Sequence, residues 1–190
     1  MFGHLQDCLP VKRGAGSSGG PEDVVLLRAE ARGPSGFWLD MAMKPDGKLK
    51  DIDRLLRRTW LECCGHLSEF STGAHREVSM NTNVNKALGS GERLGYVYDF
   101  GSSTELVVRV LGGAKAFSKG VVRLAARNEP RTWPCDTCGK AATVVCAQCL
   151  YEGKGFCCPA HVSSHDCGDE MLLPVVNSPR MGVCGYTGEA

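Results

Sequence analysis

The sequence lacks any apolar run near the length that crosses a bilayer, and aromatic residues make up only 7% of its 190 residues. A transmembrane helix needs about 20 consecutive, mostly apolar residues. The first residues, MFGHLQDCLPVKRG, also lack the charged start and apolar stretch of a secretory signal peptide. We therefore expect a cytoplasmic protein with no membrane partner.

The chain also lacks a charge imbalance, since its formal net charge is only +1. A value this small does not by itself indicate a nucleic-acid-binding protein. The charge is unevenly distributed, however. Residues 1–132 carry 19 Lys and Arg against 15 Asp and Glu, whereas residues 133–190 carry 3 against 6. The acidic end is also the cysteine-rich end, which disfavours direct phosphate binding there.

With 43% hydrophobic and 23% charged residues, the composition is that of a globular protein. A chain of this length suffices for one ordinary domain and a small module. A Gly/Ser/Pro stretch, GAGSSGGPE, indicates a flexible leader. The predicted organisation is a leader at 1–22, an α+β domain at 23–132, a zinc-binding module at 133–168, and a tail at 169–190 that packs back on the α+β domain.

The α+β domain is predicted from strand-like runs and from one segment whose apolar residues recur at helical spacing. The runs DVVLLRAEARG and GFWLDMAMKP, separated by residues 33–36 with two glycines and a proline, predict a β-hairpin. The segment KLKDIDRLLRRTWLECCGHL has apolar residues at helical spacing and predicts one long helix as far as Leu67.

Further strands are expected after this helix. EVSMN predicts a short strand and NVNKAL a helical turn, and YVYDFG, TELVVRVLG and GVVRLAARN are rich in β-branched and aromatic residues. The resulting order of elements predicts an antiparallel sheet packed on one long helix, possibly grasp-like in arrangement.

Cysteines are concentrated in one stretch, PCDTCGKAATVVCAQCLYEGKGFCCPAHVSSHDC, which holds seven of the eleven. In a reducing compartment such density indicates metal binding or catalysis rather than disulfides. The stretch contains four closely spaced ligand pairs: Cys135 with Cys138, Cys146 with Cys149, Cys158 with His161, and His165 with Cys167.

Four pairs are enough for two tetrahedral zinc ions, because a two-residue gap lets both side chains of a pair converge on one ion. The pairs could join in sequence or alternate as a cross-brace. We prefer the cross-brace, in which both sites are Cys3His. The first site then consists of Cys135, Cys138, Cys158 and His161, and the second of Cys146, Cys149, His165 and Cys167.

Both zinc ions are predicted to be structural. About 35 residues bury too little apolar surface to fold alone, and with four ligands filled no position is open for a reacting water. Thiol redox chemistry and an iron-sulfur cluster are the rival interpretations. Cys157 adjoins Cys158, and the spacing alone allows either to be the ligand.

The eight-ligand spacing resembles the cross-brace zinc finger of stress-associated proteins, the AN-one type. Three other motifs, KDIDRLLRRTWLECCGHLSEF, YVYDFGSSTELVVRV and LLPVVNSPRMGVCGYTGE, resemble a divergent branch of the plasmid pRiA4b ORF-3-like family. Members of that family are uncharacterised proteins often found near mobile elements. Its usual Trp-Arg-Arg motif on an early strand has no counterpart here.

Two further groups of residues are candidate sites. Cys63, Cys64, His66 and Cys184 could form a third zinc site, although Cys64 falls on the apolar stripe of the predicted helix and core packing is the preferred interpretation. An enzyme site could lie near Asp99 and Arg180, although Asp99 also fits a turn-forming role before Gly101. The tail 172–187 is predicted either to bind a ligand or to pack.

The preferred function is therefore that of a zinc-binding interaction protein with a protein partner. The first alternative is a nucleic-acid-binding accessory protein of a mobile element, which would use basic residues at Arg54, Arg57, Arg58, Arg123, Arg127 and Arg131. The second alternative is the enzyme with a site near Asp99 and Arg180. The sequence indicates neither a catalytic pair nor an oligomeric state.

Overall fold

The computed structural model describes residues 20–33, 36–89, 91–116 and 120–188, so most of the predicted leader lies outside the described residues. The chain divides into two compact units. The sheet unit comprises the described residues before Arg57 together with Leu67–Asn128, and the cysteine unit comprises Arg57–His66 and the described residues from Glu129 onward. None of the helices in the described ranges has the length and hydropathy of a membrane-spanning segment.

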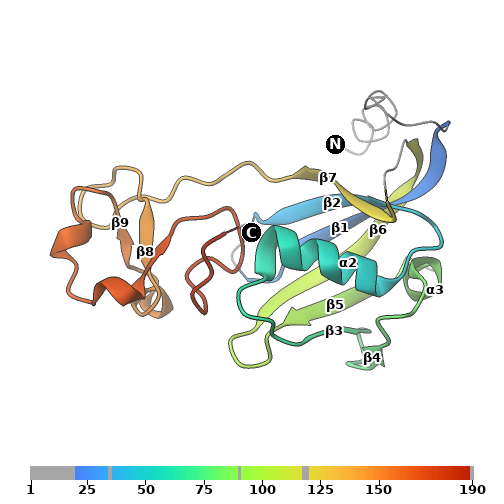
Figure 1. Ribbon diagram of the computed structural model, residues 1–190, viewed down its shortest axis with the longest axis horizontal. Helices are drawn as coiled ribbons and strands as arrows, with labels where there is room; N and C mark the ends of the chain where they lie inside the picture. The colour runs from blue at the N-terminus through green and yellow to red at the C-terminus, as the bar shows by residue number, and fades with distance from the viewer. Residues whose placement is uncertain (1–19, 34–35, 90, 117–119, 189–190) are drawn as a thin grey trace. The chain divides into compact units, whose positions relative to one another are not determined.

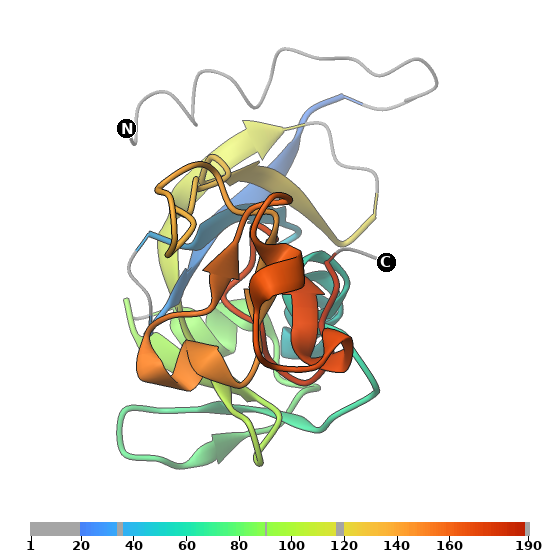
Figure 2. The same cartoon turned by 90° about the vertical axis from the view of Figure 1, so that its left-hand side faces the viewer.

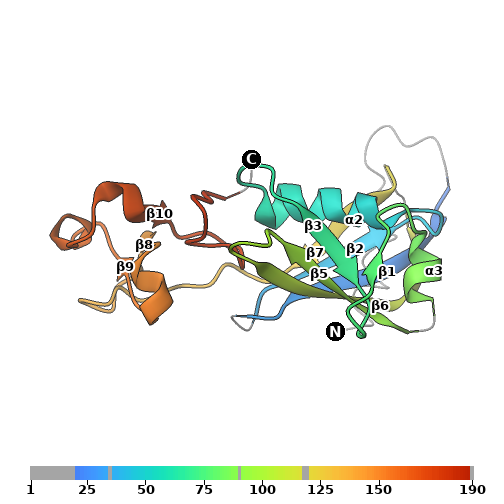
Figure 3. The ribbon, with the colours of Figure 1, turned by 90° about the horizontal axis from the view of Figure 1, so that it is seen from below.

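The sheet unit is built on an antiparallel sheet of seven strands within the described residues, in the order β4-β3-β5-β6-β1-β2-β7. The α-helix α2 (Leu49–Leu56) lies along one face of this sheet (Figures 1 and 3). The expected α+β fold, an antiparallel sheet with one main helix, is confirmed. The strands are β1 (Glu22–Ala31), β2 (Trp38–Met43), β3 (Ser68–Ser71), β4 (Glu77–Val78), β5 (Arg93–Tyr98), β6 (Thr104–Ala116) and β7 (Val122–Arg127).

The predicted hairpin lies within this sheet, between β6 and the edge strand β7. β1 and β2 pair antiparallel, with Leu27 opposite Met41 and Ala29 opposite Leu39, and all four side chains are fully buried. Because successive strand residues alternate between faces, Arg28 and Asp40 fall on the opposite face, where they form their own pair.

Arg28 and Asp40 make a bidentate ion pair across the hairpin. Arg28 Nε donates to Asp40 Oδ1 at 2.6 Å and Nη2 donates to Oδ2 at 2.8 Å. The carboxylate is only 2% exposed, and its hydrogen bond raises the pKa of Arg28 above the usual value. The guanidinium also lies over the ring of Trp38, 4.3 Å from its centroid. The register of the hairpin is therefore fixed by a buried charge pair as well as by its apolar face.

Helix α2 begins and buries its apolar face as the sequence predicts. The Asp51 carboxylate accepts a hydrogen bond from the backbone N–H of Lys48 at 3.0 Å, which satisfies a donor at the helix start. Leu49, Ile52, Leu55 and Leu56 are buried. On the same helix, Asp53 accepts hydrogen bonds from Ser68 Oγ at 2.6 Å and Tyr96 Oη at 2.8 Å, which tie α2 to β3 and β5.

The end of this helix differs from the prediction. The α-helix stops at Leu56 and a single π-helical segment, η1 (Arg57–Leu61), follows. Cys64 is exposed and Leu67 is 72% exposed. The predicted apolar face of the helix is therefore not buried at these two residues, although their spacing is helical. The helical segment ends at Leu61, four residues before Gly65, which has φ +80.

The remaining predicted elements of the sheet unit are confirmed. EVSMN contains β4, NVNKAL contains α3 (Val84–Leu88), and the three later runs are β5, β6 and β7. Asp99 lies in a tight turn after β5 with φ +65, and its Oδ1 accepts a hydrogen bond from the Gly101 N–H at 2.9 Å. This is the Asx turn expected of that residue.

The cysteine unit contains a small sheet in the order β10-β8-β9, together with single turns of 3-10 helix (Figure 2). Its buried cluster is Val145, Phe156 and Met181, and Trp133 stacks on Phe156 with ring centroids 4.8 Å apart. The elements are β8 (Val144–Cys146), η2 (Cys149–Glu152), β9 (Phe156–Cys157), η3 (Val162–Ser164), η4 (Asp169–Met171) and β10 (Leu172–Pro174).

The tail takes part in this small fold. β10 pairs with β8, and Met181 belongs to the buried cluster. The tail and residues 57–66 are therefore grouped with the module, in a unit larger than the 133–168 segment. The predicted packing of the tail on the α+β domain stays a prediction.

The buried ion pair in the hairpin yields a stability prediction. Asp40→Ala leaves the Arg28 charge without its carboxylate in a largely buried position, so we expect a loss of about 3 kcal/mol in the free energy of unfolding. Urea unfolding followed by circular dichroism measures it. The control is Glu22→Ala, which removes a half-exposed partner of Lys44 and should change stability by less than about 1 kcal/mol. Equal effects of the two variants would contradict the role of the buried pair.

Candidate metal centres

The first ligand pair lies on a tight turn at the start of the module. The N–H of Cys135 donates to the carbonyl of Lys140 at 2.7 Å, and the N–H of Gly139 donates to the carbonyl of Cys135 at 2.8 Å. Gly139 has φ +72, which only glycine adopts at little cost. The turn therefore brings the sulfurs of Cys135 and Cys138 to one side.

The second pair lies where β8 ends and η2 begins, with Cys146 on the strand and Cys149 at the first residue of the 3-10 turn. Gly155, with φ +108, runs close beside it. A Cβ on that residue would lie 2.8 Å from the Cys149 Cβ and 3.1 Å from the Cys146 Cβ. Glycine is thus required at this position by close approach as well as by backbone conformation.

The remaining four predicted ligands surround a short turn. Cys158 follows β9, His161 and His165 flank η3, and Cys167 comes two residues later. The N–H of His161 donates to the carbonyl of Cys158 at 2.9 Å. This turn aims the first two side chains and the last two in different directions.

The structure brings the eight predicted residues together in two groups. In each group the candidate ligand atoms all lie within 4.8 Å of one another. The members are Cys135, Cys138, Cys158 and His161 in the first, and Cys146, Cys149, His165 and Cys167 in the second. This is the alternating arrangement of a cross-brace, and both groups could hold a metal ion.

The spacing of the donor atoms fits zinc. Bonds of about 2.3 Å to sulfur and about 2.0 Å to nitrogen give a tetrahedron with edges of about 3.8 Å between sulfurs and about 3.5 Å between sulfur and nitrogen. Cys138 and Cys158 sulfurs are 3.7 Å apart, and so are those of Cys149 and Cys167. Cys135 Sγ lies 3.6 Å from His161 Nδ1.

The electrostatics of the thiols also favour a cation. Hydrogen bonds from backbone N–H groups, above all that of Cys158, lower the pKa of Cys135 to about 6. In the second group, burial and the neighbouring sulfurs of Cys167 and Cys146 raise the pKa of Cys149 to about 12. Thiolates packed this closely repel one another, so several of them ionise together only around a positive ion.

Cys158, and not Cys157, belongs to the first group. Cys157 lies on β9 with its sulfur 3.8 Å from the carbonyl oxygen of Gly155, and burial raises its pKa. Alternation along the strand explains the difference, because adjacent side chains point to opposite faces. Cys157 behaves as a buried thiol.

Asp136 is a supporting residue that the sequence analysis did not identify. Its Oδ2 accepts hydrogen bonds from the N–H groups of Gly155 at 2.5 Å and Phe156 at 3.0 Å. The carboxylate therefore links the first ligand turn to the strand that precedes Cys158. The sequence feature that could have indicated this role is the position of Asp136 inside a Cys-x-x-Cys pair, since polar residues beside metal ligands often hydrogen-bond to nearby backbone groups.

The structure also brings together Cys63, Cys64, His66 and Cys184. The preferred interpretation of Cys64 as a core residue is wrong, because the side chain is exposed. None of the cysteines within the described residues forms a disulfide.

The residues predicted for the enzyme site and for nucleic-acid binding are spread over both units. Arg180 is fully buried in the cysteine unit, and Asp99 forms the Asx turn in the sheet unit. Of the basic residues, Arg57 is bonded to Glu62 and to the carbonyl of His66. Arg131 lies over the ring of Trp133, 4.9 Å from its centroid.

The sheet unit has a cavity of about 270 Å³ that sequence reasoning did not find. Arg32, Thr72, His75, Tyr96 and Glu105 are among its lining residues, and Arg32 and Glu105 form an exposed ion pair at 3.8 Å. The cavity has both polar and apolar walls, and none of the predicted site residues lines it.

Comparisons with known proteins identify no family. No family model matches the chain, and no curated protein matches it. Among solved structures, the chain is similar to a protein of unknown function, MM3350 from Methanosarcina mazei Go1, with 16% identity and a TM-score of 0.48 over 56% of this chain and 69% of that chain. The fold and the donor groups define an α+β protein with Cys/His groups that could hold metal ions.

The choice between adjacent cysteines can be tested by counting ions. We expect Cys158→Ser to hold one zinc ion fewer per chain than the wild type, because it removes a ligand of the first group. Cys157→Ser should hold the same number as the wild type. Native mass spectrometry of the untagged protein gives both counts. The opposite pattern would assign the ligand to Cys157.

Metal removal should affect the two units differently. With a strong chelator such as EDTA, we expect the amides of β8 and β9 to lose protection from hydrogen exchange, because a small core needs its metal to stay folded. The amides of β1 and β2, in a large sheet with its own core, should keep theirs. Hydrogen exchange read by mass spectrometry measures both in one sample. Unchanged protection of β8 and β9 would show that the module folds without metal.

Proposed function

We propose that the protein is a zinc-binding interaction protein, in which two structural zinc ions hold the cysteine unit in the shape that a protein partner recognises. The observation that carries this proposal is the convergence of eight donor atoms into two groups with the edges of a zinc tetrahedron. Each group supplies four ligands, so a bound ion has no open position for a substrate.

The need for a structural ion follows from the size of the core. The buried cluster around β8 and β9 consists of Val145, Phe156 and Met181, with a few partly buried neighbours. A core this small offsets little of the conformational entropy that the chain loses on folding. Structural zinc contributes apparent folding free energies of about 10 to 16 kcal/mol in small modules, which is enough to decide the fold.

An exposed aromatic residue beside a ligand supports the proposal of a protein partner. Tyr151 is 83% exposed and lies on η2, which starts at the ligand Cys149. Leu150, between them, packs against the buried cluster. The η2 turn is thus held by a candidate ligand and by the core, while Tyr151 points outward. Aromatic side chains often dominate the binding energy of protein interfaces.

The charge of the unit supports the same choice. A zinc ion with three thiolates and a neutral imidazole carries one net negative charge, which adds to the acidic balance of residues 133–190. Such a surface repels phosphate backbones. Membership of the plasmid pRiA4b ORF-3-like family, and with it a role near mobile elements, remains a proposal that rests on the sequence motifs alone.

Site-specific crosslinking tests the interaction role. With a photoreactive amino acid in place of Tyr151 in the full chain, we expect a discrete protein adduct in extracts of the native host. Excess wild-type protein should compete the adduct away, whereas excess Tyr151→Ala should not, because that variant lacks the aromatic contact. The same photoreactive residue at Lys140, an exposed position of the same unit, is the control.

Three outcomes would count against the proposal. Equal adducts at the two positions would show unspecific contact. Competition by Tyr151→Ala as effective as that by the wild type would remove the aromatic side chain from the interface. Adducts with nucleic acid that disappear as salt increases would favour the accessory protein of a mobile element instead.

A further inference from the structure

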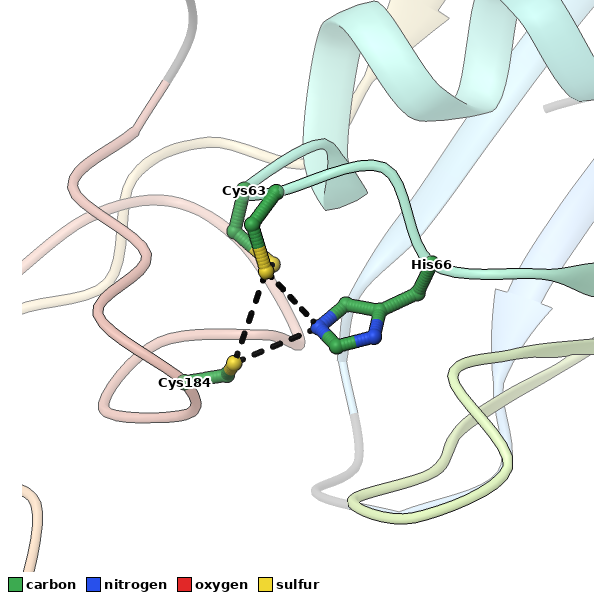
Figure 4. A group of neighbouring side chains, drawn as sticks. Cys63, His66 and Cys184 are labelled. Carbon is green, nitrogen blue, oxygen red and sulfur yellow. Dashed lines mark hydrogen bonds between the residues drawn. The ribbon is translucent and has the colours of Figure 1, made fainter.

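A third group of donors lies in the cysteine unit, away from the cross-brace. Cys63, Cys64 and His66 follow η1, and Cys184 comes from the tail. Figure 4 shows the His66 ring and the Cys184 sulfur turned toward the segment that carries Cys63. These four ligand atoms all lie within 4.8 Å of one another.

We propose that Cys63, Cys64, His66 and Cys184 form a third zinc site, of Cys3His type, that joins the first segment of the cysteine unit to its last. The site goes beyond the proposed function, which requires only the two ions of the cross-brace. All four positions are filled by protein ligands, so the ion has a structural role.

The distances between the donors support a tetrahedral ion. The sulfurs of Cys63 and Cys64 are 3.7 Å apart, and those of Cys64 and Cys184 are 3.8 Å apart. Both match the edge of about 3.8 Å expected between zinc-bound sulfurs, and both far exceed the 2.05 Å of a disulfide. The edges from His66 Nε2 are shorter, at 3.0 Å to Cys64 and 3.3 Å to Cys184.

The backbone adopts disfavoured conformations to bring these donors together. Cys184 has φ +50, and its neighbours Gly182 and Gly185 have φ +77 and +68. A left-handed conformation at a residue with a Cβ is uncommon and is kept where surrounding interactions require it. On the other side of the group, Gly65 with φ +80 lets Cys64 and His66 face the same point.

Apolar packing does not explain the grouping. Cys64 and Cys184 are both exposed, so their proximity removes little apolar surface from water. The two residues are also 120 positions apart in sequence, and holding them together costs loop-closure entropy. A shared cation supplies the attraction that burial does not.

A buried arginine stands beside the group. Arg180 is fully buried, and its Nη2 lies 3.5 Å from Cys63 Sγ. Its backbone N–H donates to Ser178 Oγ at 2.9 Å, and that hydroxyl donates to the carbonyl of Trp60 at 2.7 Å. A zinc ion with three thiolates carries one net negative charge, which the guanidinium balances. Charged neighbours of this kind tune metal ligands. Arg180 therefore contacts the group through Cys63 from a buried position.

The test is a zinc count on the full chain by native mass spectrometry, with four variants purified in the presence of zinc. We expect three ions in the wild type and two in Cys184→Ser. Cys157→Ser, which alters a buried thiol outside all three groups, should retain three. His66→Ala should hold two, and His66→Cys should again hold three, because a thiolate replaces the imidazole as fourth ligand.

These variants separate the third site from the cross-brace and from misfolding. Two ions in the wild type, unchanged in Cys184→Ser, would overturn the third site and leave the cross-brace intact. Equal counts in His66→Ala and His66→Cys would also overturn it. If Cys184→Ser loses every ion through misfolding, the recovery of the third ion in His66→Cys but not in His66→Ala still supports the site. A single loss in Cys158→Ser reports on the cross-brace alone.

Discussion

The close approach of cysteine sulfurs is the physical constraint on which the cysteine unit depends, because thiolates this close repel one another unless they share a cation. Sulfurs 3.7 Å apart are too distant for a covalent bond and too close to ionise together without a positive ion. The apolar cluster of the unit is small, so its turns and short strands are organised around the donor groups. Gly139, Gly153 and Gly155, all with positive φ, allow the chain to bend tightly enough for the donors to meet.

The sheet unit obeys a different constraint. Strands β1, β2, β3, β5 and β6 all bury apolar side chains, as does α2, so the sheet unit has a larger apolar core than the segment around β8 and β9. Buried polar contacts then select one arrangement of that core. Asp53 ties the helix to two strands, and the pair of Arg28 and Asp40 joins β1 to β2. The chain thus combines one unit that is stabilised by burial with one whose proposed stability comes from metal ligation.

Local patterns were sufficient to predict much of both units. Alternation in residues 23–46 predicts the hairpin, and turn-forming glycines divide the later strands, because these signals act over a few residues. The two-residue gaps likewise predict which cysteines act as pairs. The end of the main helix was mispredicted, because the apolar spacing continues through Cys64 and Leu67 although both side chains are exposed and the helical segment ends at Leu61.

The sequence by itself determined the α+β class and the close pairing of the candidate donors, apart from the choice between Cys157 and Cys158, since spacing within a turn follows from backbone geometry. Only the tertiary structure decided that Cys158 rather than Cys157 faces the first group, because that depends on which face of β9 is turned inward. Only the tertiary structure also brought Cys184 to Cys63, Cys64 and His66, and buried Arg180 beside them. Contacts across 120 residues arise from the folding of the whole unit, and no local periodicity encodes them.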